Sequence, residues 1–141
     1  MPCDRCAEPS IILIRYSGAH LCSSHFQEYV ERRVKQEIRR ELDLTGGRTK
    51  IAVGLSGGKD STTALFLLHE YLGRRRDVSL EAITVDEGIA GYRPPSLDIA
   101  RRFCAALGVT HHVVSYLERE GFEMDRVVHL DPEAIPCSYC G

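Results

Sequence analysis

The fold of this chain is decided by the stretch Ile51-Ala52-Val53-Gly54-Leu55-Ser56-Gly57-Gly58-Lys59-Asp60-Ser61-Thr62-Thr63. Its first five residues are mostly apolar and include β-branched side chains, which predicts a buried strand. A tight Ser-Gly-Gly turn follows, and from Asp60 and Ser61 apolar residues recur at helical spacing as far as Leu72. The stretch therefore predicts a strand, a glycine loop and the N-terminus of a helix.

Such a junction is suited to binding an anion. Two adjacent glycines allow successive backbone N–H groups to converge, the helix dipole adds partial positive charge, and Lys59 adds a full one. The loop is not a Walker A motif, which requires glycine where Val53 stands and serine or threonine where Asp60 stands. We therefore expect a phosphate-bearing ligand. A glycine-rich connection that binds nothing is disfavoured, because strand, loop and helix coincide.

Length and composition limit the class of protein. The 141 residues are enough for one α/β domain and a small additional module. Apolar residues make up 43%, and the net charge of −2 gives no overall attraction to nucleic acids. No apolar stretch approaches the roughly 20 residues of a membrane helix. We expect a cytoplasmic protein with no membrane partner, whose six cysteines are metal ligands or reactive thiols rather than disulfides.

The N-terminal segment has the pattern of a zinc site. Two pairs of metal-binding side chains, each with two residues between its members, are separated by fifteen residues: Cys3, Cys6, Cys22 and His25. Between the pairs, residues 11–16 can form a strand and residues 17–20 the turn of a hairpin. So small a segment has little apolar core, so a metal would supply its stability. We predict structural Zn²⁺; free cysteines, or His20 in place of His25, are the alternatives.

Residues 26–42 have the pattern of an amphipathic helix, with apolar side chains at every fourth position. The basic residues between them could form a stripe that contacts RNA, but glutamates nearly balance them, so we favour a solvated face of salt bridges. The break at residues 45–48 predicts a domain boundary. We expect a zinc-binding module over residues 1–25, a helix and linker over 26–48, and a nucleotide-binding domain over 49–141.

Two further apolar runs, residues 80–85 and 109–115, predict buried strands, with a helix between them that is capped by Ser96 and ends at Gly108. Alternating strands and helices with short connections predict an α/β fold with a parallel sheet. Ligands of such sheets bind beyond the carboxyl ends of the strands. Asp86 lies there, so we predict a contact with nucleotide or magnesium, although a capping role in its own loop fits nearly as well.

Other reactive side chains indicate no site by themselves. His111 and His112 point to opposite faces of a regular strand, so at most one faces inward, and we interpret both as packing or surface residues. Cys104 has apolar neighbours on a predicted helix, which favours a buried small hydrophobe. The pair Cys137 and Cys140 is ambiguous, because redox thiols, half a zinc site and two ligands of an iron–sulfur cluster share this spacing.

Together these motifs resemble a known family. Ser-Gly-Gly-Lys-Asp-Ser resembles the SGGxDS signature of the PP-loop ATP pyrophosphatases, which cleave ATP between the α- and β-phosphates and transfer AMP to a substrate oxygen. The zinc module, Val-Asp-Glu-Gly-Ile at residues 85–89 and the final Cys-Ser-Tyr-Cys-Gly narrow the resemblance to the tRNA 2-thiouridine synthases of the archaeal and eukaryotic cytosolic branch, which are related to ribothymidine thiolases of thermophiles. The resemblance covers essentially the whole chain and implies a Rossmann-like fold.

The resemblance implies roles for residues of this chain. The loop would hold the pyrophosphate of ATP through Ser56, Gly57, Gly58, Lys59, Asp60 and Ser61. Asp86 joins them as a nucleotide or Mg²⁺ contact, and Lys59 and Asp60 are also expected to act in catalysis. In this family the late cysteines, here Cys137 and Cys140, hold a 4Fe–4S cluster with a third cysteine farther along; a persulfide on one of them is the rival interpretation.

The implied reaction is ATP-dependent replacement of a uridine C2 oxygen of tRNA by sulfur. The sulfur would come from a ubiquitin-like carrier or from free sulfide, and the family's usual homodimer is a further expectation. Because the sequence stops one residue after Cys140, we interpret the chain as the N-terminal part of a longer enzyme, whose activity alone is an open question. Two other functions remain open: another PP-loop adenylating enzyme, such as an amidotransferase or synthetase, and a zinc-stabilised nucleotide- or RNA-binding fragment without activity.

Overall fold

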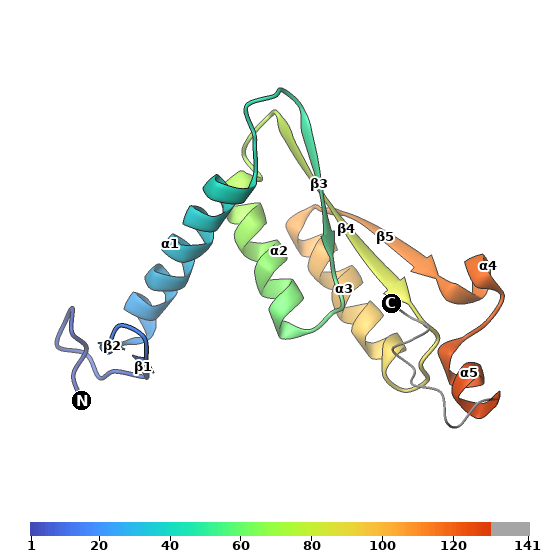
Figure 1. The fold of residues 1–141 in the computed structure, drawn as a ribbon, viewed down its shortest axis with the longest axis horizontal. Coiled ribbons are helices and arrows are strands. Elements are labelled where there is room, and N and C mark those ends of the chain that lie inside the picture. The colour runs from blue at the N-terminus through green and yellow to red at the C-terminus, as the bar shows by residue number, and fades with distance from the viewer. Residues whose placement is uncertain (131–141) are drawn as a thin grey trace. The chain divides into compact units, whose positions relative to one another are not determined.

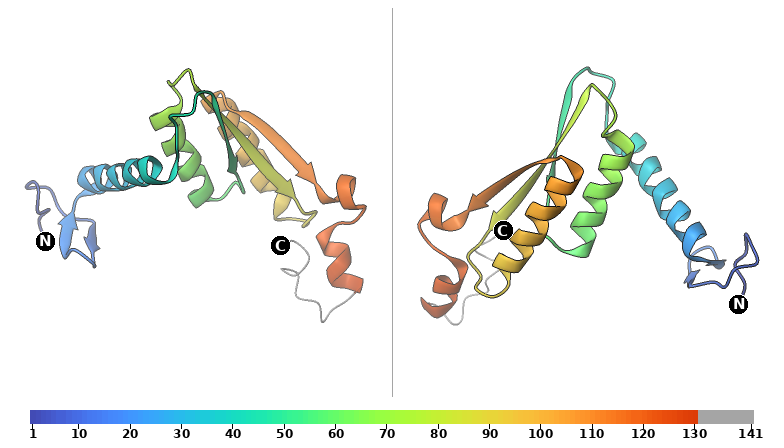
Figure 2. Two further views of the ribbon diagram at one scale, coloured as in Figure 1. Left: turned by 45° about the horizontal axis from the view of Figure 1, so that its top comes forward. Right: turned by 180° about the vertical axis from the view of Figure 1, so that it is seen from behind.

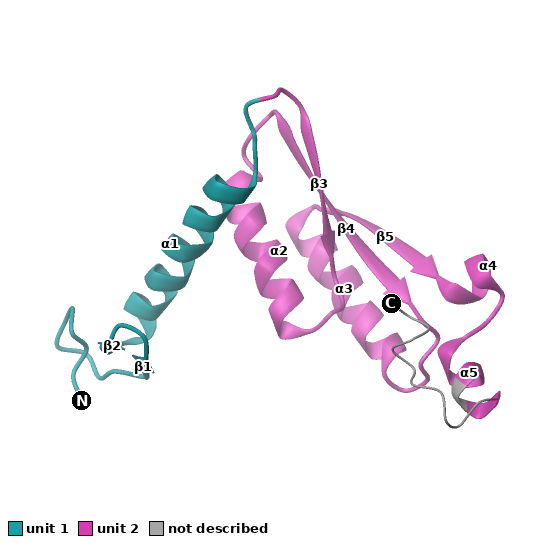
Figure 3. Cartoon of the chain, viewed as in Figure 1, with its two compact units in different colours: residues 1–45 teal, residues 46–141 magenta. Residues whose placement is uncertain are grey.

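The computed structural model of the protein describes residues 1–130 (Figure 1). The chain divides into two compact units, Met1–Thr45 and Gly46–Gly141, which are coloured separately in Figure 3. No helix in the described part of the chain is both long enough and apolar enough to cross a membrane.

The first unit is a hairpin followed by one long helix. Strands β1 (Ile12–Ile14) and β2 (Ala19–Leu21) pair antiparallel, and Gly18 closes their turn with a φ of 70°. Helix α1 spans Ser23–Glu41. The predicted start at residue 26 was therefore three residues late. Cys22 is the N-cap of α1, so the predicted metal ligands Cys22 and His25 lie at the start of this helix.

The charged face of α1 agrees only in part with the salt-bridge interpretation. Arg40 pairs with Glu37 and Glu41, and Glu28 lies 4.0 Å from Arg5. The guanidinium groups of Arg32 and Arg33 instead lie 6.0 Å from the centroids of tyrosine rings, those of Tyr29 and Tyr16 respectively.

The second unit contains the predicted parallel sheet, with strand order β3-β4-β5. The elements follow one another as β3 (Thr49–Gly54), α2 (Lys59–Leu72), β4 (Val78–Asp86), α3 (Arg93–Leu107) and β5 (Thr110–Ser115). Helices α2 and α3 contact each other and lie on one face of the sheet (Figures 1 and 2). Two successive right-handed crossovers in this strand order place both helices on that face.

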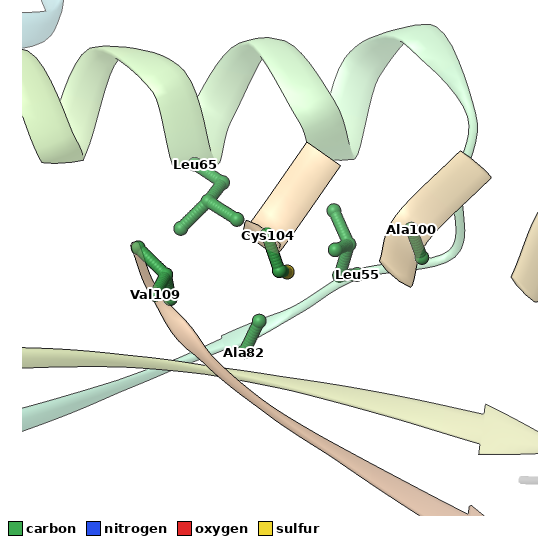
Figure 4. Close-up of a cluster of buried hydrophobic side chains, with 6 residues drawn as sticks. All are labelled: Leu55, Leu65, Ala82, Ala100, Cys104 and Val109. Carbon is green, nitrogen blue, oxygen red and sulfur yellow. The ribbon is translucent and has the colours of Figure 1, made fainter. Parts of the chain in front are cut away.

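The core of this unit lies between the sheet and these two helices. Six buried residues form it, and Figure 4 shows how they face one another: Leu55, Leu65, Ala82, Ala100, Cys104 and Val109. Cys104 is thus the buried hydrophobe that its apolar neighbours predicted, and burial raises the pKa of its thiol. Leu65 is completely buried, so truncating it to alanine would cost about 2–5 kcal/mol.

The start of α3 differs from the prediction. The helix begins at Arg93 with Tyr92 as N-cap, so the expected cap at Ser96 was wrong. Pro94 and Pro95 are accommodated in the first turn, where backbone N–H groups have no intrahelical acceptor. The Ser96 hydroxyl donates instead to the Arg93 carbonyl at 2.9 Å.

Two short helices after β5 were not predicted. They are α4 (Tyr116–Glu120) and α5 (Met124–Leu130). The Ser115 hydroxyl accepts a hydrogen bond from the Glu118 N–H, which makes Ser115 the cap of α4.

Candidate nucleotide site and metal centre

The glycine loop lies at the carboxyl end of β3 and contacts the first turn of α3. Gly57 has a φ of 83°, in the left-handed region that favours glycine. A Cβ atom at this position would collide with the backbone carbonyl of Ser96. The first glycine is therefore required both by the turn and by the close approach of the two backbones.

Two serine hydroxyls of the loop hydrogen-bond within the loop itself. Ser61 Oγ accepts from the Ser56 N–H at 3.2 Å, lies 3.0 Å from Ser56 Oγ and contacts the Gly58 carbonyl at 3.2 Å. Ser56 Oγ lies 3.4 Å from the Gly58 nitrogen. Ser56 and Ser61 therefore shape the loop, and Ser61 lies in the first turn of α2.

This arrangement leaves backbone donors available at the helix N-terminus. The first intrahelical hydrogen bond runs from the Thr62 N–H to the Gly58 carbonyl. Within residues 1–130, four N–H groups of the loop and first turn have no acceptor: those of Gly57, Lys59, Asp60 and Ser61. The Lys59 ammonium is 87% exposed and lies 2.9 Å from the Asp60 carboxylate. The loop thus combines free amides, a helix N-terminus and a cation, as an anion site requires.

A pocket of about 210 Å³ adjoins the loop at the edge of the sheet. Its lining comes from β3, the loop, β4, the turn after β4 and the first residue of α3: Gly54, Leu55, Ser56, Ile83, Val85, Glu87 and Arg93. Most of these residues are apolar, and Glu87 and Arg93 form an ion pair. A concave, mainly apolar site with a few polar groups is the usual form of a small-molecule pocket.

A hydrogen-bonded chain across the three strands supports the start of the loop. Thr84 is buried, and its hydroxyl donates to the Leu55 carbonyl at 2.5 Å. Having one proton, this hydroxyl must accept at 2.7 Å from His111, which is therefore protonated at Nε2. Burial, with smaller contributions from Arg101 and His112, lowers the pKa of His111 below 6.5. His112 faces the other way and contacts Glu81 at 2.9 Å, as the alternation along the strand predicted.

The remaining predicted residues of this unit do not all meet at the loop. Asp86 lies at the end of β4, where its Oδ1 accepts from the Gly88 N–H at 3.1 Å, so the structure contains the capping alternative; a nucleotide or magnesium contact stays a prediction. Cys137 and Cys140 lie outside the described residues.

Three polar residues near the loop were not predicted. The buried Arg93 forms an ion pair with the half-buried Glu87 beside the loop, and Thr84 contacts the first carbonyl of the loop. Glu87 belongs to the motif at residues 85–89, but no local pattern indicates its pairing with Arg93. Neither a threonine within an apolar strand nor an arginine before two prolines signals a site by itself.

The predicted metal ligands of the first unit converge. One ligand atom from each of Cys3, Cys6, Cys22 and His25 lies within 4.8 Å of the others. The His25 Nδ1 atom is 3.3–3.5 Å from the three sulfurs, and the Cys6 and Cys22 sulfurs are 3.7 Å apart. A tetrahedron with the usual Zn–S and Zn–N bonds has edges of about 3.6 Å for S···N and about 3.8 Å for S···S. The donor set therefore fits tetrahedral Zn²⁺, and His20 is not part of it.

The pKa values of the Cys3 and Cys6 thiols are shifted in opposite directions. Burial opposes ionisation of Cys3, but hydrogen bonds from the Cys22 and Arg5 backbones outweigh it and lower its pKa to about 6. For Cys6, the Glu8 backbone contact lowers the pKa, but burial and the neighbouring thiols raise it overall. A cation at the centre would remove this conflict between neighbouring thiolates, because it attracts all of them.

Comparisons with known proteins match both units. A family model described as the N-terminal LIM domain of the 2-thiouridine synthetase TtuA matches residues 3–27, and the PP-loop domain model matches residues 26–133. The chain is 40% identical over 148 residues to "tRNA 2-thiolation protein NcsA" of Haloferax volcanii, covering 100% of this chain and 46% of the relative. It is 35% identical to "tRNA-5-methyluridine(54) 2-sulfurtransferase" of Pyrococcus horikoshii, covering 100% of this chain and 43% of the relative.

A solved structure of a tRNA thiolase also matches the whole chain. It is the U34-tRNA thiolase NcsA of Methanococcus maripaludis, with its 4Fe–4S cluster; the TM-score is 0.82 at 36% identity, covering 100% of this chain and 45% of that one. The chain thus spans about half the length of the relatives that it matches. By the match over residues 26–133 and by these relatives, the chain belongs to the PP-loop family, in the branch that contains the tRNA 2-thiolation proteins.

Proposed function

We propose that this chain supplies the ATP-binding PP-loop domain and the zinc module of an ATP-dependent tRNA 2-thiolation enzyme. The observation that carries the proposal is the glycine loop, which has free amides and Lys59 at the N-terminus of α2, next to a pocket that Ser56 lines. The named activities of the relatives support tRNA as the substrate. In domain terms, residues 1–25 are the zinc module, 26–48 a helix and linker, and 49–141 part of the PP-loop domain.

In the proposed reaction, the C2 oxygen of a tRNA uridine attacks the α-phosphorus of ATP and pyrophosphate leaves. A sulfide then attacks C2 of the adenylated base, and the C2 oxygen departs with AMP. The amides of Gly57 and Lys59, with the Lys59 ammonium, stabilise the charge that grows on pyrophosphate, because they are already oriented before the reaction. Asp60 accepts hydrogen bonds only, so it orients Lys59, its neighbour at 2.9 Å, rather than binding phosphate itself.

The proposal includes three metal sites in this chain. The cluster of Cys3, Cys6, Cys22 and His25 would hold structural Zn²⁺, because four ligands fill its coordination sphere. Asp86 would contribute to a Mg²⁺ on the ATP phosphates. Cys137 and Cys140, with a third cysteine from elsewhere in the enzyme, would hold a 4Fe–4S cluster that would carry the sulfide received from the donor. A ubiquitin-like carrier or free sulfide as donor, a homodimer and a cytoplasmic location complete the proposal.

Analysis of the nucleotide products tests this function. The complete gene product, purified without oxygen, is incubated with ATP, magnesium, sulfide and unmodified tRNA. We expect AMP and pyrophosphate only when tRNA is present, together with 2-thiouridine in the tRNA. AMP formed regardless of tRNA, or an ammonia-dependent product, would indicate another adenylating enzyme. ATP or tRNA binding without any AMP would indicate a binding module.

A further inference from the structure

Arg93 is the only charged residue that is buried in the part of the chain that the structure describes, with 6% of its surface exposed. One end of its guanidinium pairs with the Glu87 carboxylate. The other end contacts the Ser56 carbonyl at 3.4 Å and Ser96 Oγ at 3.5 Å, and Nε has no partner among the described residues. A buried charge is costly even when paired, so its retention beside the loop calls for an explanation beyond stability.

The contact with Ser56 fixes more than one atom. The peptide bond between Ser56 and Gly57 is planar and trans, so its C=O and N–H point in opposite directions. Holding the Ser56 carbonyl toward Arg93 therefore directs the Gly57 N–H away from Arg93. That N–H is one of the four free donors of the loop. Gly57 also lacks the side chain that would otherwise restrain this peptide.

The partner of Arg93 is itself held in place by α5. The Glu87 carbonyl accepts from the Met124 N–H at 2.7 Å, and the Asp125 carboxylate accepts from the Ala90 N–H at 2.7 Å. Gly88 approaches Glu123 so closely that a Cβ would collide with its side chain. The backbone that carries Glu87 is therefore held by the start of α5.

We propose that Arg93 is a positioning residue for the nucleotide loop: paired with Glu87, it orients the peptide between Ser56 and Gly57 so that the Gly57 N–H points at the pyrophosphate group of ATP. The proposal rests on the proposed function, because it takes ATP as the ligand. It differs from a role in binding, since Arg93 acts through Ser56 and need not touch the nucleotide. A lysine has one charged nitrogen and cannot contact both Glu87 and Ser56 in this planar geometry.

The test compares Arg93→Met, Arg93→Lys and Glu87→Gln in the whole protein. Arg102→Met is the matched control, because Arg102 pairs with Asp98 on the same helix with 74% of its side chain exposed. Two quantities are measured: the NMR order parameter of the Gly57 amide without nucleotide, and the dissociation constant for magnesium pyrophosphate. The melting temperature of each variant separates loop effects from unfolding.

In the unsubstituted protein we expect a Gly57 order parameter near the value of about 0.85 for rigid backbone, falling below about 0.6 in Arg93→Met. Pyrophosphate should bind at least about tenfold more weakly in Arg93→Met and by an intermediate amount in Arg93→Lys, while Arg102→Met changes neither quantity. If Arg93→Met does not fold, Glu87→Gln decides, because it keeps Arg93 and removes only its counter-charge; a measurable loss of Gly57 order is then expected.

An unchanged Gly57 order parameter in every folded variant would overturn the proposal. So would equal weakening in Arg102→Met, since that would reflect general destabilisation. Failure of the proposed function is recognised separately, because the order parameter is measured without nucleotide or tRNA. A protein that makes no AMP with tRNA but loses Gly57 order in Arg93→Met would retain this positioning role and lose the proposed reaction.

Discussion

The two sites of this chain are built on opposite principles. In the first unit, the cluster of Cys3, Cys6, Cys22 and His25 supplies two of the three buried core residues, so the ligands are themselves the core. In the second unit, six buried residues form a core without any of the loop's polar groups, and Lys59 is 87% exposed. The comparison teaches that the same kind of substitution should unfold one unit and leave the other folded but inactive.

The largest effect is expected from the metal ligands. Cys22→Ser removes one ligand and one core residue, so the first unit should lose most of the metal free energy, which is on the order of 10 kcal/mol for structural zinc. We expect loss of bound zinc and rapid proteolysis within residues 1–45, with the second unit still folded. Metal analysis and limited proteolysis measure this.

His20→Gln is the matched control, because His20 lies on the same hairpin outside the ligand set. It should keep its zinc. Full zinc content in Cys22→Ser would contradict the inference that the first unit depends on its metal ligands for stability.

The next effect concerns rate rather than folding. Lys59→Ala should lower the rate of AMP formation on the order of a hundredfold or more, since a preoriented charged donor stabilises a transition state by roughly 3–4 kcal/mol. Zinc content and melting temperature should stay the same, because the ammonium is exposed. Steady-state kinetics and calorimetry provide the measurement. The control is Lys50→Ala, which removes an exposed lysine of β3 that pairs with Glu81 of β4. Undiminished AMP formation in Lys59→Ala would exclude the anion-binding role of the loop.

The features that the sequence predicted are those with local signals. The Cys3 and Cys22 motifs have fixed spacings, and residues 51–63 combine an apolar run, glycines and helical periodicity. The convergence of the four possible metal ligands and the parallel sheet were therefore predicted correctly, and the binding role of the loop stays a prediction. The start of α3 was not, because Ser96 is a typical cap and the two prolines before it read as a loop.

The features that were not predicted from the sequence depend on contacts between distant segments of the chain. Arg93 is buried only because the chain brings Ser56 and Glu87 beside it. The pairing of Thr84 with His111 requires the register of β4 and β5, which no local pattern gives. Helix α5 has seven residues and too short an apolar pattern to be distinguished from a loop.

A glycine substitution should give an intermediate effect on both stability and binding in the second unit. Gly57→Ala places a Cβ against the Ser96 backbone at a positive φ, at a cost of about 1–3 kcal/mol. The loop must move, so ATP should bind more weakly while the core remains. Urea unfolding and nucleotide titration test this. Gly46→Ala is the control, since its Cβ meets nothing within 4 Å at an ordinary φ. Wild-type stability and ATP affinity in Gly57→Ala would contradict the close contact between loop and α3.

The smallest effect is a pH dependence that arises from His111. Its pKa in the folded protein lies below the usual 6.5 because it is buried, so the unfolded chain binds more protons below pH 6.5. The contribution of His111 to the free energy of unfolding is fully present above pH 6.5. It is lost as the pH falls toward the pKa of His111 in the folded protein, with a slope of at most about 1.4 kcal/mol per pH unit. The pKa of Glu81 is lowered from 4.5 by Lys50 and His112, so Glu81 decreases the free energy of unfolding only when the pH falls below about 4.5. Urea unfolding between pH 4.5 and 6.5 should therefore show a shallower slope in His111→Gln, whose amide can still donate to Thr84. Parallel curves for the two proteins would mean that His111 is not held neutral by burial, and that the loop's support on β4 and β5 is open to solvent.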